Sequence, residues 1–449
     1  IAGGVARYLL VDGQQRLITL SVLLAALRDW ARDRDDKTAG MVHDRYLQNR
    51  RVEGLDNLKV LPSQDDREAF MAVIERKPLL KDSLVTKAYK YFSNILSNGL
   101  AIDGTRKEEF VPQRVMETIV SSLVFVSITL NSNENPYRVF ESLNWKGTRL
   151  TQADLLRNYF LMRFSSDQNE LNELYERLWK PIEDGLDKPV EDGRRKPPSE
   201  NFVRDYVVKD GEFIRDREVY RAWKLRLDKQ QQSVQVRSSL EDLSRYSTFY
   251  RHLLYPQTEP DGDVQDRLSR LNRWGGTTTY PFLLNLYGAV DSGSLTKRGL
   301  AQILSLIESF LVRRLFANVP TNELNRLFIT LYTRPGETDD LVEATWKKLS
   351  SRGLRWPTDQ EFEHAILTYP LYRDSRPEQR KLILQTLERA HDDPEPVSLA
   401  NLTIEHVMPQ TLTTEWREHL GDEAEHVYRS YIHTLGNLTL TGYDPGLSN

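Results

Sequence analysis

Apolar residues recur at helical spacing along most of this 449-residue chain. Leu17, Leu20, Leu24, Leu27 and Trp30 lie three or four positions apart, the spacing that places side chains on one face of a helix. From about residue 136 onward the same period predicts helices, most clearly over Tyr137–Leu143, Gln152–Phe164 and Leu300–Phe316. A chain with this pattern folds mainly by packing helices against one another.

Two short segments favour β-strands instead. Arg7–Val11 ends at an Asp-Gly turn, and Leu123–Leu130 is rich in β-branched and aromatic residues. Together with the helices they predict an α+β protein that is mostly α-helical.

Clusters of turn-forming residues divide the chain into three blocks. Such clusters occur at Asp184–Ser199, Tyr255–Asp263 and Asp392–Val397, and no repeat of 20 to 50 residues is evident. We predict an α/β domain over residues 1–165, a helical region over 166–395 and a small C-terminal domain over 396–449. Because the chain opens on Ile1-Ala2-Gly3-Gly4 without Met, we expect that it begins inside its first domain.

Composition excludes several classes of function. The chain has no cysteine, so disulfides, zinc–thiolate sites and thiol nucleophiles are ruled out, which fits a cytoplasmic protein. No stretch approaches the roughly 18 apolar residues of a membrane span, so no membrane partner is expected. The net charge of −4 means that any DNA-binding surface must be a local patch of Lys and Arg.

The strongest chemical pattern lies near the C-terminus. Thr403–Gln410 reads Thr-Ile-Glu-His-Val-Met-Pro-Gln, and Leu435–Asn449 reads Leu-Gly-Asn-Leu-Thr-Leu-Thr-Gly-Tyr-Asp-Pro-Gly-Leu-Ser-Asn. This order predicts a strand with an acid–His pair, an insertion, a second strand that begins at Asn, and a turn into a helix. It is the layout of a ββα metal finger, in which His activates water and a hard cation such as Mg²⁺ neutralises the scissile phosphate.

Histidine alone is weak evidence for such a site. Glu405 and His406 are adjacent, so on a regular strand their side chains point to opposite faces, and both serve one site only if the strand end twists. The alternative is that His406 is a structural histidine in a strand–Pro turn. His419, His426 and His433 repeat every seven residues in the insertion, and we expect them to be exposed on helices.

A second pattern lies at the predicted first strand-to-helix junction. Asp12-Gly13-Gln14-Gln15-Arg16 combines a glycine that permits close approach, the free amides of a helix start, and an arginine fork. These features suit a phosphate group. The alternative is a plain capped turn, with Asp12 as the N-cap of the helix.

Three further groups carry open alternatives. Asp154, Arg157 and Asn158 share a helix side and are either functional or a polar face. The pair Arg313-Arg314 either contacts DNA or forms an ion pair between elements. Arg215–Arg226, with Tyr220 and Trp223 interleaved, is either a DNA-facing patch or an amphipathic helix.

The spelling of these motifs resembles the GmrSD-type, modification-dependent (type IV) restriction endonucleases. The resemblance rests on Asp-Gly-Gln-Gln-Arg-Leu at Asp12–Leu17, on Phe140-Glu141 with Asn144 and Gly147 ahead of an Asp-Leu helix, and on the Glu-His-Val-Met-Pro-Gln and Gly-Asn-Leu-Thr-Leu runs. Phosphorothioate-sensing and BREX-associated fusion proteins are similar. The resemblance implies a ParB/sulfiredoxin-like N-terminal domain that binds and hydrolyses a nucleoside triphosphate, and a C-terminal HNH (His-Me finger) nuclease domain.

The same resemblance assigns roles to individual residues. It implies that His406 is the general base, that Asn437 orients the His loop and that Glu405 is an acidic metal ligand. Asn449, or otherwise Asp444, supplies the last ligand to Mg²⁺ or another divalent cation. The family carries Asn near position 444, where this chain has Asp. Asp12, Gly13, Gln14, Gln15 and Arg16 form the site for GTP or another nucleotide. A Tyr-Gln-Arg motif is expected before Ile1 and a Lys-bearing helix after Asn449.

The sequence thus predicts an anti-phage restriction endonuclease or nickase that acts on modified double-stranded DNA, with nucleotide hydrolysis coupled to cutting. The modification (a phage base or a phosphorothioate), the preferred nucleotide, nicking versus double-strand cleavage and a homodimer are left open. The alternative function is a nucleotide- and DNA-binding regulatory protein with a degenerate nuclease finger, and another is a nuclease that uses no nucleotide.

Overall fold

The computed structural model describes most of the chain. The described residues are 8, 10, 13–49, 52, 54–62, 64–80, 83–98, 110–129, 151–163, 173–187, 198–229, 233–334, 337, 338, 340–351, 356–391, 399 and 402–442. They form two compact units, Ile1–Arg149 and Leu150–Asn449. Both are mainly helical, as the sequence predicts, whereas the division into three domains stays a prediction.

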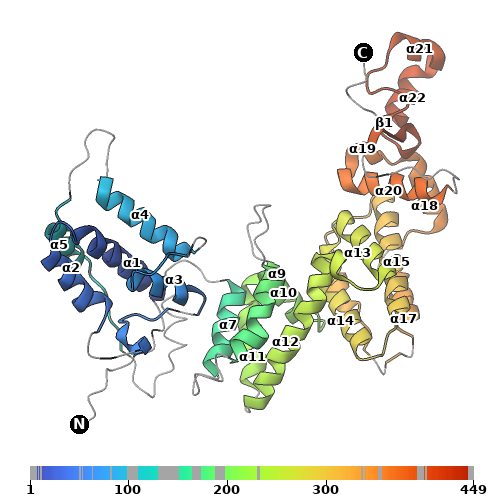
Figure 1. Ribbon diagram of the computed structural model, residues 1–449. Helices are drawn as coiled ribbons and strands as arrows, with labels where there is room; N and C mark the ends of the chain where they lie inside the picture. The colour runs from blue at the N-terminus through green and yellow to red at the C-terminus, as the bar shows by residue number, and fades with distance from the viewer. Residues whose placement is uncertain are drawn as a thin grey trace. The chain divides into compact units, whose positions relative to one another are not determined.

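The first unit is a helical bundle (Figure 1). Its helices are α1 (Gln14–Ala31), α2 (Asp36–Val42), α3 (Gln64–Ile74), α4 (Leu84–Asn98) and α5 (Pro112–Ser122), with single turns at His43–Leu47 and Gly54–Asn57. The predicted apolar stripe of Leu17–Trp30 lies on α1, which packs against each of the other four helices or the turns next to them.

A buried arginine ties α1 to α3. The guanidinium of Arg28 is fully buried and donates to the backbone oxygens of Ile74 (2.7 Å) and Val73 (3.2 Å) at the end of α3. Asp29 accepts from Arg28 and Arg76 and from the hydroxyl of Tyr89 on α4. These hydrogen bonds satisfy a charge that would otherwise be very costly to bury.

The predicted strand at Leu123–Leu130 is wrong over its described residues. Residues 123–129 run extended after α5 but pair with no strand in the described part of unit 1, and Val124 and Val126 are each 87% exposed. β-propensity records a fit to a pleated, half-buried surface, so the pattern cannot form a strand without a partner. Of the predicted strand Arg7–Val11, only Tyr8 and Leu10 are described, and they lie in no element.

The second unit contains a longer array of helices. In chain order they are α7 (Gln152–Arg163), α9 (Lys180–Leu186), α10 (Pro198–Val208), α11 (Val219–Asp228), α12 (Ser233–Leu254), α13 (Gly262–Trp274), α14 (Tyr280–Asp291), α15 (Lys297–Phe316), α16 (Leu324–Thr330), α17 (Leu341–Leu349), α18 (Asp359–Thr368), α19 (Leu371–Asp374) and α20 (Pro377–Ala390). The predicted helices Gln152–Phe164 and Leu300–Phe316 correspond to α7 and α15, while Tyr137–Leu143 lies outside the described residues. The predicted loop at Asp184–Ser199 is confirmed only in part, because α9 extends to Leu186 and α10 begins at Pro198.

Local signals explain where several of these helices begin and end. Asp261 caps α13 by accepting from the amide of Val264, and Thr358 and Glu361 form a capping box at α18. Gly275 ends α13 in the left-handed conformation (φ 79°), and Gly276 then donates to Leu271 O.

An ion pair joins three helices close to the C-terminal segment. Arg270 on α13 donates from Nε to both carboxylate oxygens of Glu308 on α15 (2.9 and 3.0 Å), and its Nη2 donates to Thr386 on α20. Both charged side chains are largely buried, which favours the paired state because an isolated charge would be costly there. These bonds hold α20 against α13, and β2 (Leu438–Thr441) of the C-terminal segment contacts α20.

The C-terminal segment is a two-stranded antiparallel hairpin with a helical insertion (Figure 1). Strand β1 (Thr403–His406) pairs with β2 (Leu438–Thr441), and the insertion holds α21 (Thr414–Leu420) and α22 (Ala424–Tyr431). Within the described residues these are the strands of the protein, apart from one isolated bridge between Gln48 and Leu58. None of the described helices combines the length and the apolar character that crossing a membrane requires.

Candidate functional site

His406 is the last residue of β1, opposite Leu438 at the start of β2. Residues alternate along the strand, so Glu405 is exposed while His406 is half-buried on the inner face. The pair therefore points to opposite faces, as the strand period requires. His406 stands where the strand ends, next to the turn that follows.

Asn437 holds the turn after His406. Its side chain is buried, and its Oδ1 accepts from the amide of Met408 at 2.7 Å. Its Nδ2 donates to the backbone oxygens of Met408 (3.0 Å) and Ile432 (2.9 Å), and its own carbonyl accepts from the amide of Val407 (3.0 Å). One amide side chain thus cross-links the turn after β1 to the segment before β2. The structure brings together the two residues to which the sequence assigned catalytic roles.

A cluster of rings surrounds His406. The ring of Tyr372, from α19, meets that of His406 edge-on with centroids 4.3 Å apart, and it stacks on His433 at 5.9 Å and 13°. The backbone amide of Tyr372 donates to His433 O at 3.0 Å. The guanidinium of Arg380, from α20, lies over the ring of Tyr372, 4.4 Å from the ring centroid.

The expectation that His433 is an exposed helix residue is wrong. It follows the end of α22 and is half-buried against Tyr372, whereas His419 and His426 are exposed on α21 and α22. Sequence analysis also missed Tyr372 and Arg380, because no spacing links them to the hairpin. For His433 a signal existed, since it lies only four residues before Asn437.

The surroundings of His406 disfavour its charged form. Partial burial lowers the pKa of the imidazole below its usual value, and the nearby His433 and Arg380 add to this, whereas the carboxylate of Glu405 opposes it. The Nε2 atom of His406 and the Nδ1 atom of His433 are both buried without a hydrogen-bond partner in the described structure. A neutral imidazole can accept a proton, which is what a base requires.

Of the expected metal ligands, the structure describes only Glu405. Glu405 is exposed, and its carboxylate forms no hydrogen bond or ion pair with a described residue. Asp444 and Asn449 lie outside the described residues. In the described part of the chain, no three His, Asp or Glu side chains are grouped closely enough to hold a metal ion. The donor present, a single free carboxylate, fits a hard cation that keeps several of its waters.

At the N-terminal motif the structure describes Gly13 to Arg16. Gly13 has φ 88°, a conformation that L side chains rarely adopt, and it rather than Asp12 is the N-cap of α1. Asp12 itself lies outside the described residues. Gln14 is half-buried, Gln15 and Arg16 are exposed, and the guanidinium of Arg16 folds back beside Gly13. Gly13 has no side chain with which to cap the first amides of α1.

The other open groups are engaged in helix packing. Arg157 pairs with Asp154 and with Glu183 on α9 at 2.6 Å. Arg313 bonds Asp359 and Pro357 O, and the largely buried Arg314 donates to Pro320 O. Tyr220 and Trp223 on α11 are buried in the core, so that segment is an amphipathic helix rather than an aromatic DNA-facing patch.

Two family profiles match the chain. Residues 2–161 match the N-terminal domain of GmrSD restriction endonuclease, and residues 356–444 match the C-terminal domain of GmrSD restriction endonucleases. The second match spans α18 to α20, the hairpin and its insertion, so it contains Tyr372 and Arg380 as well as His406. No curated protein matches the chain. The chain belongs to the GmrSD restriction endonuclease family, and this makes DNA its partner.

Proposed function

We propose that the protein cuts or nicks DNA with His406 as the general base. The observation that carries this proposal is the hydrogen-bonding of the Asn437 side chain, which holds the amide and the carbonyl of Met408 after His406 and links them to the carbonyl of Ile432 before β2. A base must be held within hydrogen-bonding reach of the water it activates, so such fixing has a direct catalytic purpose. The ring contacts of Tyr372 add a second restraint on the imidazole itself.

The chemistry follows from the state of the imidazole. Because Nε2 is buried, we assign the water-facing nitrogen as Nδ1. The neutral ring takes a proton from water, the resulting hydroxide attacks the phosphorus, and the bond to the leaving sugar oxygen breaks. That oxygen takes up a proton from solvent and leaves as a hydroxyl group. His406 is then an imidazolium, which loses its proton to solvent.

Glu405, with Asp444 or Asn449, would hold a divalent cation such as Mg²⁺. When bound, this cation supplies positive charge to the phosphate oxygens as negative charge builds up on them. Glu405 lies on the opposite face of β1 from His406, so the site requires the end of the strand to twist. The free carboxylate of Glu405 supports this assignment.

For the N-terminal domain we propose binding and hydrolysis of a nucleoside triphosphate, coupled to cutting of modified foreign DNA. The positive φ of Gly13, its position as the N-cap of α1 and the guanidinium of Arg16 beside it support a phosphate site at this helix start. A ParB/sulfiredoxin-like fold for this domain, an HNH finger at the C-terminus and a cytoplasmic location belong to the same proposal.

Plasmid nicking tests the nuclease. Wild-type protein with Mg²⁺ should nick a susceptible plasmid and EDTA should stop it, whereas His406→Ala should lose at least 100-fold in rate. His426→Ala is the matched control, because this exposed histidine lies in the insertion, away from the cluster. A wild type that binds DNA but cuts no plasmid of a panel bearing glucosylated, hypermodified or phosphorothioate DNA would favour a degenerate finger.

Phosphate release tests the nucleotide proposal separately. Arg16→Ala should abolish DNA-stimulated hydrolysis, and Arg32→Ala, an exposed arginine after the same helix, should not. If Arg16→Ala hydrolysed the nucleotide as fast as the wild type, the loop around Arg16 would not be the nucleotide site.

A further inference from the structure

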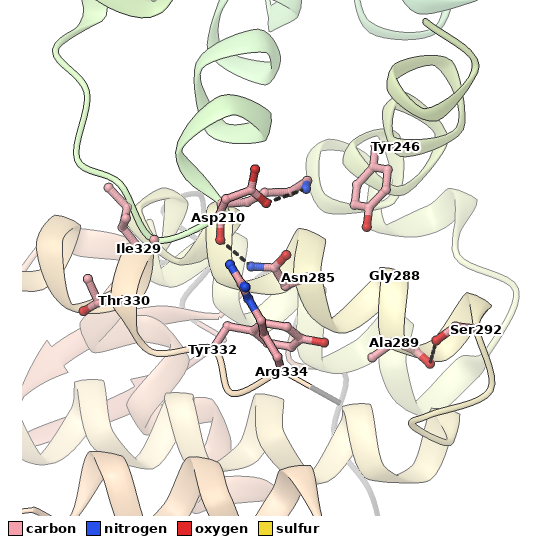
Figure 2. Close-up of a pocket in the computed structure, with 12 residues that line it drawn as sticks. Asp210, Tyr246, Asn285, Gly288, Ala289, Ser292, Ile329, Thr330, Tyr332 and Arg334 are labelled. Atoms are coloured by element: carbon pink, nitrogen blue, oxygen red, sulfur yellow. Dashed lines mark hydrogen bonds and ion pairs between the residues drawn. The ribbon is translucent and has the colours of Figure 1, made fainter. Parts of the chain in front are cut away.

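A pocket of about 340 Å³ lies among the helices of the second unit, and its lining contains no residue of either motif (Figure 2). It is lined by residues that follow α10, by α12 and α14, and by the end of α16 with the segment after it. This volume is at the lower end of the range of small-molecule sites, roughly 300 to 1,000 Å³. It admits a ligand the size of one nucleotide and excludes a duplex.

Two cationic side chains line this pocket, of which one is paired with a described carboxylate and the other is not. Lys209 is largely buried and pairs with Asp210 at 2.9 Å, and its ammonium lies over the rings of Tyr206 (4.7 Å) and Tyr246 (4.9 Å). Arg334 is exposed, and no described carboxylate lies within ion-pair distance of its guanidinium. With one carboxylate against two cations, the lining is net positive and suits an anion. The planar fork of Arg334 is well shaped for a phosphate.

The pocket also offers aromatic and hydrogen-bonding groups. The hydroxyls of Tyr246 and Tyr332 point into it (Figure 2). Burial, together with Asp242, raises the pKa of Tyr246 to about 12, so its hydroxyl keeps its proton at neutral pH. Asn285 uses its Nδ2 to bond Lys209 O at 2.6 Å, and no described residue donates to its Oδ1. An amide oxygen together with phenol hydroxyls suits the hydrogen-bonding edge of a nucleotide base.

Gly288 allows the ring of Tyr246 to lie close against α14. A Cβ at this position would lie 2.4 Å from the hydroxyl oxygen of Tyr246, closer than side chains approach one another. Only glycine therefore lets the tyrosine ring rest against α14 in its present position. The backbone of α14 and the ring of Tyr246 together shape one wall.

We propose that this pocket binds a single nucleotide, with its phosphate on Arg334 and Lys209 and the edge of its base toward the hydroxyls of Tyr246 and Tyr332. The nucleotide is either a free nucleoside monophosphate or one nucleotide turned out of a DNA strand, since the chemistry is shared. Asn285 and the tyrosine hydroxyls read the edge of the base. This site is separate from the hairpin and does not depend on His406.

Binding of deoxynucleoside monophosphates to the full chain tests the site, with inorganic phosphate and the matching nucleosides as reference ligands. At least one monophosphate should bind 10-fold more tightly than inorganic phosphate. Arg334→Ala should weaken it at least 10-fold, and Ser292→Trp, which places a large ring in the pocket, should abolish it. Arg326→Ala, an exposed arginine on α16 outside the lining, is the matched control and should bind normally, as should Arg16→Ala.

The source of the nucleotide is distinguished with 2-aminopurine in a duplex. If the 2-aminopurine fluorescence rises when the protein binds the duplex, and Ser292→Trp abolishes this rise, the pocket takes a nucleotide from DNA. If the monophosphate binds but the fluorescence in the duplex does not rise, the pocket takes a free nucleotide. His406→Ala should bind like the wild type, so loss of nicking and loss of this site are separate results. The proposal is overturned if no monophosphate binds more tightly than inorganic phosphate, or if Arg334→Ala and Ser292→Trp, both folded by circular dichroism, bind like the wild type.

Discussion

Replacing Asn437 with alanine should release the turn that follows His406. The substitution removes three hydrogen bonds and leaves the amide of Met408 and the carbonyls of Met408 and Ile432 without their partner. A buried polar group without a partner costs about 1–3 kcal/mol. Since the hairpin lies at the surface and water can reach part of it, we expect a loss of roughly 2–4 kcal/mol in local stability.

That loss sets the expected effect on catalysis. Each 1.36 kcal/mol changes the equilibrium constant between the ordered and the released turn about tenfold, so nicking should fall by up to roughly 30- to 1,000-fold if only the ordered turn is active. Asn437→Asp should not rescue the rate. It keeps an acceptor for the Met408 amide but places a carboxylate oxygen against two backbone carbonyls.

Hydrogen exchange at the Met408 amide is the most specific assay, because that amide donates to the side chain being removed. Exchange should be faster in Asn437→Ala and unchanged in Asn325→Ala, whose asparagine is exposed on α16. Unchanged exchange at Met408, with thermal stability within about 0.5 kcal/mol of the wild type, would show that Asn437 does not hold this turn.

Three further predictions concern packing and charge. Tyr372→Ala should lower nicking at least tenfold by removing the ring against His406, whereas Tyr372→Phe should keep the activity; equal rates for the two variants would contradict this. Burial raises the pKa of Asp205 from 3.8 to about 7, so the folded state holds a proton that the unfolded chain releases. The wild type should therefore lose up to roughly 4 kcal/mol relative to Asp205→Asn as pH rises from 4 to 7, seen by urea unfolding at each pH, and a pH-independent difference would be inconsistent with it. Arg28→Met should destabilise the first unit by about 3 kcal/mol in denaturant unfolding, because Asp29 loses its buried partner; a neutral outcome would show that Arg28 is dispensable.

Helices were the most predictable part of this fold. The apolar spacing of Leu17 to Trp30 identifies α1, and that of Leu300–Phe316 identifies α15, because a helix buries a stripe that is fixed by local geometry. The strand predicted at Leu123–Leu130 was wrong because a strand, unlike a helix, is not fixed by local geometry alone. A strand exists only with a partner, and residue composition does not state where that partner lies.

Some residues of the candidate site could be predicted from the sequence and others could not. His406 and Asn437 were predictable because the motif places them at facing ends of two adjacent strands. Tyr372 and Arg380 were not, because they reach His406 through the packing of α19 and α20 against the hairpin. That packing depends on contacts between residues 25 or more positions apart in sequence.

The role of His406 as the base is tested by the nicking rate of His406→Ala, measured with and without added imidazole. The variant should lose at least 100-fold in rate, and free imidazole should restore part of the activity with saturating dependence on its concentration. A variant that nicks at the wild-type rate without imidazole would contradict the assignment of His406 as the base.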